Sequence, residues 1–446
     1  MKVTVYGAGY VGLVTSVCLA EIGHHVLCTD VATEKIVQLQ QCIPPIHEEG
    51  LEQLIQRNTQ TNRLQFTVSV EEAVTHGDIQ LIAVGTPQCE DGSVNLEYVD
   101  AVAHAIGKLR IKPCIVANKS TVPPGTADRV HELIAKTAAK YKRVNPAHVV
   151  SNPEFLQEGI AVQQCLNPDR ILIGTTSPTA IAAMKELYGP LLHAETKSQF
   201  IVMSTRAAEL AKYAANSLLA TKISFINELS EIAESVGVDI AEVKRGIVAD
   251  YRINEAFLNE GCGFGGSCFP KDLAGLEKIA QEHQCSPFLI SAVIARNKRQ
   301  QQLVFKKLNT YFNGELQKKI IAVWGLSFKP GTDDVRCASS HVLIDALLQV
   351  GARIQAYDPL AMQATAEYYK KDLSKLHFAE SALGALEQAD ALAVVTEWPQ
   401  FKNISLSAIY SVLKHPVIID GRNIFDPDEA IEAGFYYSGV GRVRNQ

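Results

Sequence analysis

The hydrophobic residues at the start of the chain alternate between short strand-like runs and longer helix-like runs. Lys2–Tyr6 is rich in β-branched residues, and Val11–Ile22 is apolar over the length of a helix. Further short apolar strands are expected at His25–Thr29, Ile79–Val84, Cys114–Asn118, Val149–Ser151 and Arg170–Gly174. Strands that alternate with helices predict a parallel sheet with helices on both faces.

The middle of the chain has a different pattern. Ser204–Ser235 contains no Gly or Pro and is rich in Ala, Leu, Glu and Lys, which predicts one long helix. Shorter helices are expected at Asp239–Gly246 and from Asp272 to about Asn309, with the glycine-rich loop Gly261–Cys268 between them. A helical middle region of this kind would connect two α/β parts and offer a dimer surface.

The α/β pattern then restarts. The strand Lys319–Trp324, Gly325, the helix Ser339–Val350 and a strand ending at Asp358 repeat the order of elements in Lys2–Asp30. Later strands are expected at Ala391–Val395 and Pro416–Ile419. The sequence therefore predicts two doubly wound α/β domains joined by a helical middle region, with boundaries at residues 1–200, 201–310 and 311–446.

Composition narrows the class of protein. A chain of 446 residues suits two or three domains, and 47% hydrophobic with 20% charged residues is typical of globular proteins with large cores. The net charge of −6 predicts no basic surface for nucleic acid. Glycines interrupt the uncharged start of the chain, so we expect neither a signal peptide nor a membrane span. The ten cysteines form no CxxC pair and no zinc-spaced cluster, which predicts reduced thiols, a cytoplasmic location and no metal.

A dinucleotide-binding fingerprint lies at the first strand-to-helix turn. Gly7, Gly9 and Gly12 form a GxGxxG motif, and Asp30 ends the next strand about twenty residues later. The glycines allow a pyrophosphate to approach the helix N-terminus. Asp30 would accept hydrogen bonds from the ribose hydroxyls and repel a 2′-phosphate, which favours NAD over NADP. Lys35, about one helical turn later, is a further candidate for that ribose or an ordinary surface lysine.

The loop Gly261–Cys268 has four glycines within six residues and ends in a cysteine. So many glycines usually let a ligand or another backbone come close. Lys271 and Asp272 follow directly; a nearby cation lowers the pKa of a thiol, and a carboxylate can act as a base. Cys268 is therefore a candidate nucleophile, whereas Cys262 is better explained as a structural thiol.

Other candidate groups occur on the long helix and after strands. Lys212 and Asn216 lie one turn apart and could polarise an oxygen, although the sequence alone favours a solvated helix face. After the strand ending at Ser151, we expect a helix with Asn152 as its N-cap and Pro153 in its first turn. Glu154–Glu158 would then be part of that first turn, at a strand end where open sheets bind ligands. The loops Lys119–Pro123 and Ser327–Arg336 also follow strands, and the second brings Lys329 and Arg336 to a position that suits an anion.

Eight segments in a fixed order carry a family resemblance. They are VTVYGAGYVGL, VGTP, KSTVPPGT, NPEFLQEG, ELAKYAAN, GFGGSCFPKD, FKPGTDDVR and VTEWPQF. With them, the chain resembles the UDP-glucose 6-dehydrogenases, within the group that includes GDP-mannose and UDP-N-acetylmannosamine dehydrogenases. The resemblance covers almost the whole chain and implies two Rossmann-like domains, one for NAD and one for UDP. It also implies a long helix that forms a homodimer or part of a larger homo-oligomer.

The resemblance implies a role for each candidate residue. Cys268 would be the nucleophile, Lys212, Asn216 and Asp272 would bind the reacting oxygen and water, Glu154 would act as an acid/base, and Thr121 would order the water. The residues implied to contact NAD are Gly7, Gly9, Val11, Gly12, Asp30, Lys35, Thr86, Thr121, Glu158, Lys271 and Arg336. Those implied to contact the UDP-sugar are Glu154, Phe155, Leu156, Gln157, Glu158, Lys212, Asn216, Arg252, Phe257, Leu258, Asn259, Glu260, Gly261, Gly265, Phe328 and Lys329.

The expected reaction is oxidation of UDP-glucose by two NAD to UDP-glucuronate, through a thiohemiacetal and a thioester on Cys268. The same chemistry on GDP-mannose or an N-acetylated UDP-hexosamine is the nearest alternative. A hydroxyacid dehydrogenase that performs a single oxidation would have no use for the cysteine loop or a second α/β domain. A nucleotide-sugar sensor would bind without turnover, which the set of Lys212, Asn216, Cys268 and Asp272 argues against. Supply of a capsule or exopolysaccharide rests on analogy alone.

Overall fold

The computed structural model describes residues 1–144, 147–192, 198–370 and 374–443, and the chain divides into two compact units. Unit 1 consists of Met1–Ala215 and Ala274–Gln284, and unit 2 of Asn216–Leu273 and Cys285–Gln446. The division falls within the long helix α9 (Thr205–Val236) and within α11 (Phe269–Glu282). No helix of the described residues is long and apolar enough to cross a membrane.

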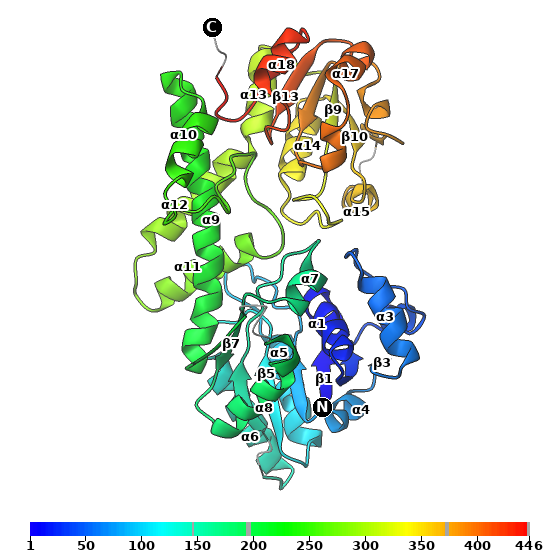
Figure 1. Ribbon diagram of the computed structural model, residues 1–446, viewed down its shortest axis with the longest axis vertical. Coiled ribbons are helices and arrows are strands. Elements are labelled where there is room, and N and C mark those ends of the chain that lie inside the picture. Colours follow the sequence, from blue (N-terminus) through cyan, green and yellow to red (C-terminus); the bar gives the residue numbers. More distant parts are fainter. Residues whose placement is uncertain (145–146, 193–197, 371–373, 444–446) are drawn as a thin grey trace. The chain divides into compact units, whose positions relative to one another are not determined.

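Unit 1 contains an eight-stranded sheet (Figure 1) with the strand order β3-β2-β1-β4-β5-β6-β7-β8. Neighbouring strands are parallel except for β6 and β7, which pair antiparallel. The first six strands have the order typical of a doubly wound dinucleotide-binding sheet. The strands are β1 (Lys2–Tyr6), β2 (His25–Thr29), β3 (Leu64–Thr67), β4 (Ile79–Ile82), β5 (Cys114–Asn118), β6 (Ala147–Ser151), β7 (Arg170–Gly174) and β8 (Gln199–Met203).

Helices cover both faces of this sheet. One core contains side chains of α1, α2, α3, α7 and α8, and the other contains those of α4, α5 and α6. Each core buries the β-branched residues that the strands direct to that face, which explains why both faces of the sheet are apolar. The helices are α1 (Tyr10–Glu21), α2 (Thr33–Gln40), α3 (Leu51–Gln60), α4 (Val70–His76), α5 (Glu97–Leu109), α6 (Thr126–Lys140), α7 (Ala161–Leu166) and α8 (Pro178–Tyr188).

Unit 2 contains a six-stranded parallel sheet with the order β11-β10-β9-β12-β13-β14, which matches the first six strands of unit 1. Its strands are β9 (Ile320–Trp324), β10 (Arg353–Tyr357), β11 (Leu376–Phe378), β12 (Ala391–Val394), β13 (Val417–Asp420) and β14 (Tyr436–Ser438). Its helices beyond α9 and α11 are α10 (Ile240–Val248), α12 (Phe288–Gln301), α13 (Leu303–Tyr311), α14 (Ser339–Gln349), α15 (Met362–Tyr368), α16 (Pro399–Lys402), α17 (Leu406–Val412) and α18 (Pro427–Glu432).

The structure confirms the predicted fold class. Two doubly wound sheets are present, and the long helix covers Thr205–Val236 where Ser204–Ser235 was expected. Four short strands were not predicted: β3, β8, β11 and β14. Each has three to five residues and lies at the edge of its sheet. The boundaries between the three domains expected from the sequence remain a prediction.

The predicted internal repeat corresponds to one physical arrangement that occurs in both sheets. Gly7 and Gly325 follow the first strand of each sheet with positive φ angles of 100° and 93°. A Cβ on Gly7 would lie 2.6 Å from the carbonyl oxygen of Ala83, and one on Gly325 would lie 2.3 Å from the Cβ of Thr396. Both neighbours follow the fourth strand of their sheet, so glycine is required at the same topological position twice.

The aspartates that end the second strands also correspond, but their surroundings differ. Asp30 accepts a hydrogen bond from the N–H of Ala8 at 2.8 Å and stays partly accessible. Asp358 is fully buried; its Oδ2 accepts from the N–H of Leu326 at 2.7 Å and from Trp398 Nε1 at 3.0 Å. The carboxylate of Asp358 is therefore saturated by the protein, whereas that of Asp30 can still meet a ligand.

We expect Asp358→Asn to lower the free energy of unfolding of unit 2 by about 2–3 kcal/mol, because the amide nitrogen would face backbone N–H donors. Trp324 and Trp398 are the only tryptophans of the chain and both belong to unit 2, so urea unfolding followed by tryptophan fluorescence measures this loss. Asp30→Asn is the matched control and should cost less, because water can solvate its carboxamide. Equal losses in the two variants would contradict this account.

Candidate functional site

The turn between β1 and α1 is built for close approach to the helix N-terminus. A Cβ on Gly12 would lie 1.8 Å from the carbonyl oxygen of Gly7, so packing of the turn itself requires Gly12. Gly9 differs, because a Cβ there would meet no atom of the described chain within 4 Å. Gly9 is the N-cap of α1 and provides no side-chain cap. The open space over Gly9 and the uncapped helix end together fit the phosphates of a dinucleotide.

Asp30 is held beside this turn as a carboxylate. Its Oδ1 accepts a hydrogen bond from the N–H of Ala32 at 3.0 Å, and Lys35 Nζ lies 3.3 Å from its Oδ2. Burial would raise the pKa of Asp30, but the N–H groups of Ala32 and Ala8 and the charge of Lys35 outweigh it, so the pKa lies below its usual value. The acid is therefore ionised at neutral pH and would repel a phosphate at the ribose 2′ position.

A buried ion pair lies at the strand ends of unit 1. Lys212 Nζ on α9 lies 3.1 Å from Glu154 Oε1, and both side chains are more than nine-tenths buried. The other oxygen of Glu154 accepts a hydrogen bond from the N–H of Leu156 at 2.5 Å. Burial would raise the pKa of Glu154, but Lys212, the N–H of Leu156 and Lys119 lower it below its usual value. The Phe155 ring packs against this group, 5.1 Å from Lys212 Nζ.

The prediction of a helix that begins at Asn152 is wrong. Residues 152–158 are irregular, and α7 begins only at Ala161. Asn152 does not cap a helix: its Nδ2 donates to the carbonyl of Leu172 at 3.0 Å, and its Oδ1 accepts from the Tyr188 hydroxyl at 2.6 Å. These tertiary hydrogen bonds hold Asn152 outside any helix. Glu154 pairs with Lys212 on α9 and does not share a helix face with Glu158.

Sequence reasoning assigned no role to three buried charged residues around this region. Lys119 is 7% exposed, and burial lowers its pKa, although Cys165 and Glu154 act in the opposite direction. Glu209, one turn before Lys212 on α9, accepts hydrogen bonds from the N–H groups of Gly125 and Ala127. Glu48 accepts a hydrogen bond from the N–H of Gly159 at 2.7 Å.

Glu209 and Glu48 fix the loops that carry other candidates. The bonds of Glu209 fix the loop that follows Thr121. The carbonyl of Thr121 accepts a hydrogen bond from Thr86 Oγ1 at 3.0 Å. The bond of Glu48 fixes the end of the Glu154–Glu158 segment. None of these contacts can be read from the sequence. The only signal there is the helical spacing that places Glu209 one turn before Lys212.

The sequence alone favoured a solvated helix face for Lys212 and Asn216, but the structure buries both residues. Their exposed fractions are 3% and 6%. In unit 2, Asn216 Nδ2 donates to Asp272 Oδ2 at 2.6 Å, and Lys271 Nζ donates to Asp272 Oδ1 at the same distance. A buried carboxylate with both an amide and an ammonium partner can orient a water or an alcohol proton.

Cys268 lies directly before α11, and its carbonyl accepts the hydrogen bond from the N–H of Asp272 at 2.8 Å. The thiol is exposed, and Ser267 Oγ lies 3.6 Å from its Sγ. The position at a helix N-terminus favours negative charge on the sulfur. Cys262, in contrast, is fully buried; its Sγ lies 3.5 Å from the carbonyl oxygen of Val395, and burial raises its pKa.

The glycines of this loop are explained mainly by the protein's own backbone. A Cβ on Gly265 would lie 2.3 Å from the carbonyl oxygen of Cys337, and one on Gly266 would lie 2.9 Å from the Phe328 ring. Asn297 on α12 clamps the loop by bonding both the N–H and the carbonyl of Phe264, at 2.8 and 2.9 Å. The loop is thus a tightly packed support for Cys268.

The remaining candidates of unit 2 differ in accessibility. Leu258 is 2% exposed and packs in the core against α9 and α10, so its contribution to a ligand site would come from its backbone. Arg252 is exposed and bonds to Asp250 through Nε and Nη2. Arg336 bonds in the same way to Asp334. Phe257, Glu260, Phe328 and Lys329 are half-buried, and Asn259 is exposed. Among the described residues, no group of three or more His, Cys, Asp or Glu side chains could hold a metal ion.

Models of one family match most of the chain. The NAD binding domain of the UDP-glucose/GDP-mannose dehydrogenase family matches residues 1–192, the central domain residues 206–299 and the UDP binding domain residues 322–427.

Full-length relatives and a solved structure agree with these matches. A UDP-glucose 6-dehydrogenase of Pseudomonas aeruginosa is 44% identical over 100% of this chain and 98% of its own length. A UDP-glucose 6-dehydrogenase of Bacillus subtilis is also 44% identical, over 99% of this chain and 98% of its own. The structure of a UDP-glucose dehydrogenase from Pyrobaculum islandicum superposes with a TM-score of 0.90 at 36% identity, covering 99% of this chain and 98% of that one.

The buried pair of Lys212 and Glu154 gives a pH-dependent prediction. Because the folded pKa of Glu154 lies below its unfolded value, its ionisation stabilises the fold above the unfolded pKa, and this contribution is lost as the pH falls through the folded pKa. Lys212→Met should therefore lower the free energy of unfolding by about 3 kcal/mol near neutral pH. The difference from the wild type should shrink as the pH falls below the unfolded pKa of about 4.3, because the wild type then loses the contribution of the ion pair.

Urea unfolding followed by circular dichroism at both pH values measures this effect. Lys212→Arg is the control, since it keeps the positive charge and should retain most of the stability. A loss that is the same at both pH values would show that packing of the lysine stem, and not the ion pair, is responsible.

Proposed function

Because the chain belongs to the UDP-glucose/GDP-mannose dehydrogenase family, we propose that it is a UDP-glucose 6-dehydrogenase, an oxidoreductase that uses NAD. The reaction is UDP-glucose with two NAD and water giving UDP-glucuronate and two NADH. The observation that carries this proposal is the 44% identity, over the whole chain, to enzymes named for this activity. The match of residues 322–427 to a UDP binding domain supports a nucleotide sugar as the substrate.

The residues around the β1–α1 turn fit NAD. The space over Gly9 admits the pyrophosphate to the N-terminus of α1, and the ionised Asp30 accepts the ribose hydroxyls. When bound, NAD accepts a hydride from carbon. We assign further contacts with this cofactor to Val11, Lys35, Thr86, Thr121, Glu158, Lys271 and Arg336.

In the first oxidation, the C6 hydroxyl of the sugar loses its proton as its carbon loses a hydride. We assign the binding of this oxygen to Lys212 and Asn216, one turn apart on α9. An ammonium and an amide stabilise the negative charge that develops on the oxygen. Asp272 accepts hydrogen bonds from Lys271 and Asn216 and is the candidate acceptor of the proton, directly or through a water.

Cys268 explains how one enzyme carries out the second oxidation. Its thiolate attacks the aldehyde carbon, a C–S bond forms, and the carbonyl oxygen takes up a proton, which gives a thiohemiacetal. Loss of that proton and of a hydride from the same carbon leaves a thioester. The covalent bond keeps the aldehyde in place between the two oxidations. The exposed sulfur at the N-terminus of α11 suits this role.

Hydrolysis of the thioester needs an activated water. The water adds to the carbonyl carbon, the C–S bond breaks, and Cys268 leaves as a thiolate while the carboxylate forms. We assign Glu154 to accept the proton of this water, because Lys212 and Lys119 keep it ionised. Thr121 would orient the water through its hydroxyl.

The nucleotide-sugar contacts are assigned to two parts of unit 2 and one of unit 1. In unit 2 they are Phe257–Gly261 with Gly265, Phe328 and Lys329; in unit 1 they are Glu154–Glu158. Arg252, exposed on its own subunit, is assigned to a substrate held by a neighbouring copy. GDP-mannose and N-acetylated UDP-hexosamines are the alternative substrates for the same chemistry.

The proposal predicts two NADH for each UDP-glucose consumed by the purified protein with excess NAD. Cys268→Ser should lower the rate of NADH formation by at least about 10³-fold, because a serine hydroxyl is a far poorer nucleophile than a thiolate at neutral pH. NADH absorbance and chromatography of the sugar nucleotide measure the ratio. Cys262→Ser is the control for loss of a thiol from the same loop.

The outcomes separate the parts of the proposal. One NADH per sugar, unchanged in Cys268→Ser, would contradict covalent catalysis and indicate a simple alcohol dehydrogenase. Turnover of GDP-mannose or a UDP-hexosamine but not UDP-glucose would change only the substrate. Binding of UDP-glucose without any turnover would indicate a sensor.

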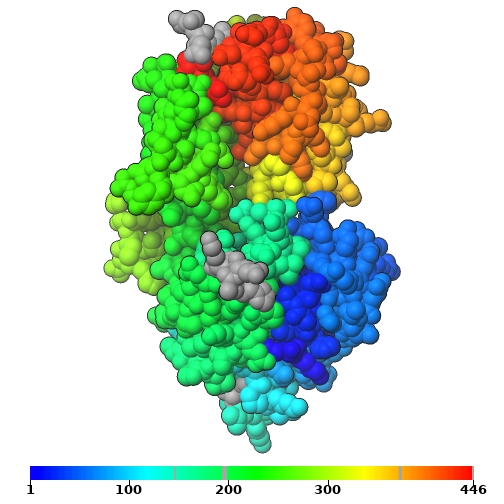
Figure 2. Space-filling view, in the orientation of Figure 1, coloured from blue at the N-terminus to red at the C-terminus, as the bar shows by residue number. Residues whose placement is uncertain are grey.

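We further propose that the protein is a homodimer or a larger homo-oligomer built on α9. Leu218, Phe225 and Ile232 recur every seven residues on this helix and are 63%, 54% and 50% exposed. Three large apolar side chains on one helical stripe are costly to leave in water and are typical of a helix–helix interface. In Figure 2, residues of α9 and α10 in unit 2, coloured green, form part of the molecular surface on the face in view.

Phe225→Glu should therefore weaken the oligomer, because it places a charge at the centre of the apolar stripe. Light scattering coupled to size-exclusion chromatography should show a shift toward monomer at micromolar concentration. Lys298→Glu, an exposed substitution on α12, should leave the mass unchanged. A monomeric wild type would contradict the interface altogether.

We place this activity in the cytoplasm. The ten cysteines are all free, and a catalytic thiol on an exposed loop requires a compartment that keeps thiols reduced.

A further inference from the structure

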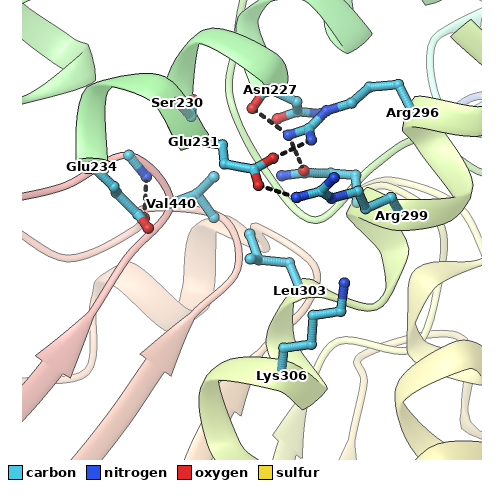
Figure 3. Close-up of a pocket in the computed structure, with 11 residues that line it drawn as sticks. Asn227, Ser230, Glu231, Glu234, Arg296, Arg299, Leu303, Lys306 and Val440 are labelled. Carbon is cyan, nitrogen blue, oxygen red and sulfur yellow. Dashed lines mark hydrogen bonds and ion pairs between the residues drawn. The ribbon is translucent and has the colours of Figure 1, made fainter. Parts of the chain in front are cut away.

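A pocket of about 190 Å³ opens in unit 2 between α9, α12 and α13 (Figure 3). Its charged side chains are Glu231 and Glu234 from α9, Arg296 and Arg299 from α12, and Lys306 from α13. Leu303 and Val440 add a small apolar wall. The volume corresponds to roughly six water molecules, so it suits a small molecule and is too small for a nucleotide sugar.

The charges of the pocket do not balance. Glu231 pairs with both Arg296, at 2.5 Å, and Arg299. Glu234 is neutralised by Lys307 at 2.8 Å and also accepts the N–H of Gly441. Lys306 has no hydrogen bond or ion pair from its ammonium group within the described part of the chain. The charged lining residues alone therefore have a net charge of +1. When Lys307, which neutralises Glu234 from outside the lining, is included, the group has an excess of two positive charges.

Two lining residues also carry buried hydrogen-bond donors. Arg296 Nε and Asn227 Nδ2 are buried and lack a hydrogen-bond partner among the described residues. Arg296 is nine-tenths buried and Asn227 is 1% exposed. Unpartnered donors in such positions are costly unless a ligand or ordered water satisfies them. Every uncompensated group at this pocket is thus a donor or a cation.

We infer that this pocket is a binding site for a small anion that carries a phosphate group, such as inorganic phosphate or a short phosphate monoester. A phosphate monoester carries about 1.5 to 2 negative charges at neutral pH, which the positive excess of the lining together with Lys307 offsets. Its oxygens accept the parallel N–H groups of an arginine, and an ammonium such as that of Lys306 completes a common phosphate environment. The apolar wall admits a short carbon chain.

The pocket shares its wall with the support of the Cys268 loop. Asn227 Oδ1 accepts the N–H of Gly261 at 2.9 Å, and Gln300 Nε2 donates to the carbonyl of Gly261 at 2.6 Å. Arg296 Nη2 in turn donates to the carbonyl of Asn227 and to Gln300 Oε1. An anion bound to Arg296 therefore stiffens the residues that hold the first glycine of the loop. This consequence concerns the mobility of Cys268 and does not depend on its role in catalysis.

The test uses the full chain in a low-salt buffer free of phosphate. Millimolar inorganic phosphate should raise the thermal midpoint by about 2 °C or more over sodium chloride of equal ionic strength. Lys306→Met and Arg299→Gln should abolish this shift, and Lys306→Arg should restore it. Lys298→Met, which removes an exposed lysine of α12 outside the pocket, is the matched control and should behave like the wild type.

Alkylation by iodoacetamide, resolved by peptide mass spectrometry, tests the connection to the loop. Phosphate should slow alkylation of Cys268 by about twofold, while the exposed Cys285 reacts unchanged. An equal phosphate shift in Lys306→Met and in the wild type would place the phosphate elsewhere and overturn the inference, as would no shift in any protein. A shift without an effect on Cys268 would overturn the connection to the loop.

Discussion

In both sheets, the carboxylate at the end of the second strand accepts hydrogen bonds from the backbone of the turn that follows the first strand. These bonds tie Asp30 to Ala8 and Asp358 to Leu326. The turn must also pass the end of the fourth strand so closely that only glycine fits, at Gly7 and at Gly325. The same constraint therefore fixes the turn between the first strand and the following helix in both sheets.

The same arrangement serves different purposes in the two units because its surroundings differ. Around Asp30, the protein leaves one side of the carboxylate and the space over Gly9 open, so the turn can receive a dinucleotide. Around Asp358, Trp398 and the turn's own N–H groups satisfy the oxygens, and the carboxylate is sealed. A nucleotide bound to unit 2 would therefore need other residues, and the half-buried side chains of Phe257, Phe328 and Lys329 are the candidates.

The two buried carboxylates of the candidate site, Glu154 and Asp272, each have a charged partner, and the partners explain the chemistry proposed for them. Glu154 is paired with Lys212 and kept ionised, which a base requires and which burial alone would prevent. Asp272 is held by Lys271 and Asn216. Each carboxylate would be expensive to bury without its partners, so these pairs are also stability elements. Both carboxylates are at positions to which the proposed mechanism assigns a proton transfer.

The sequence by itself determined the fold class, the long helix, the dinucleotide fingerprint and the glycine-rich loop that ends at Cys268. These features depend on local patterns: strand and helix periodicity, glycine spacing, and a cysteine next to Lys271 and Asp272. Tertiary structure decided what those patterns could not. Asn152 was expected to cap a helix, but bonds to Leu172 and Tyr188 hold it in an irregular segment. Lys212 was expected in solvent and is buried, and Lys119 and Glu209 gained roles only because distant strands meet beside α9. Burial and hydrogen-bond partners arise from residues far apart in the chain, so no local pattern records them.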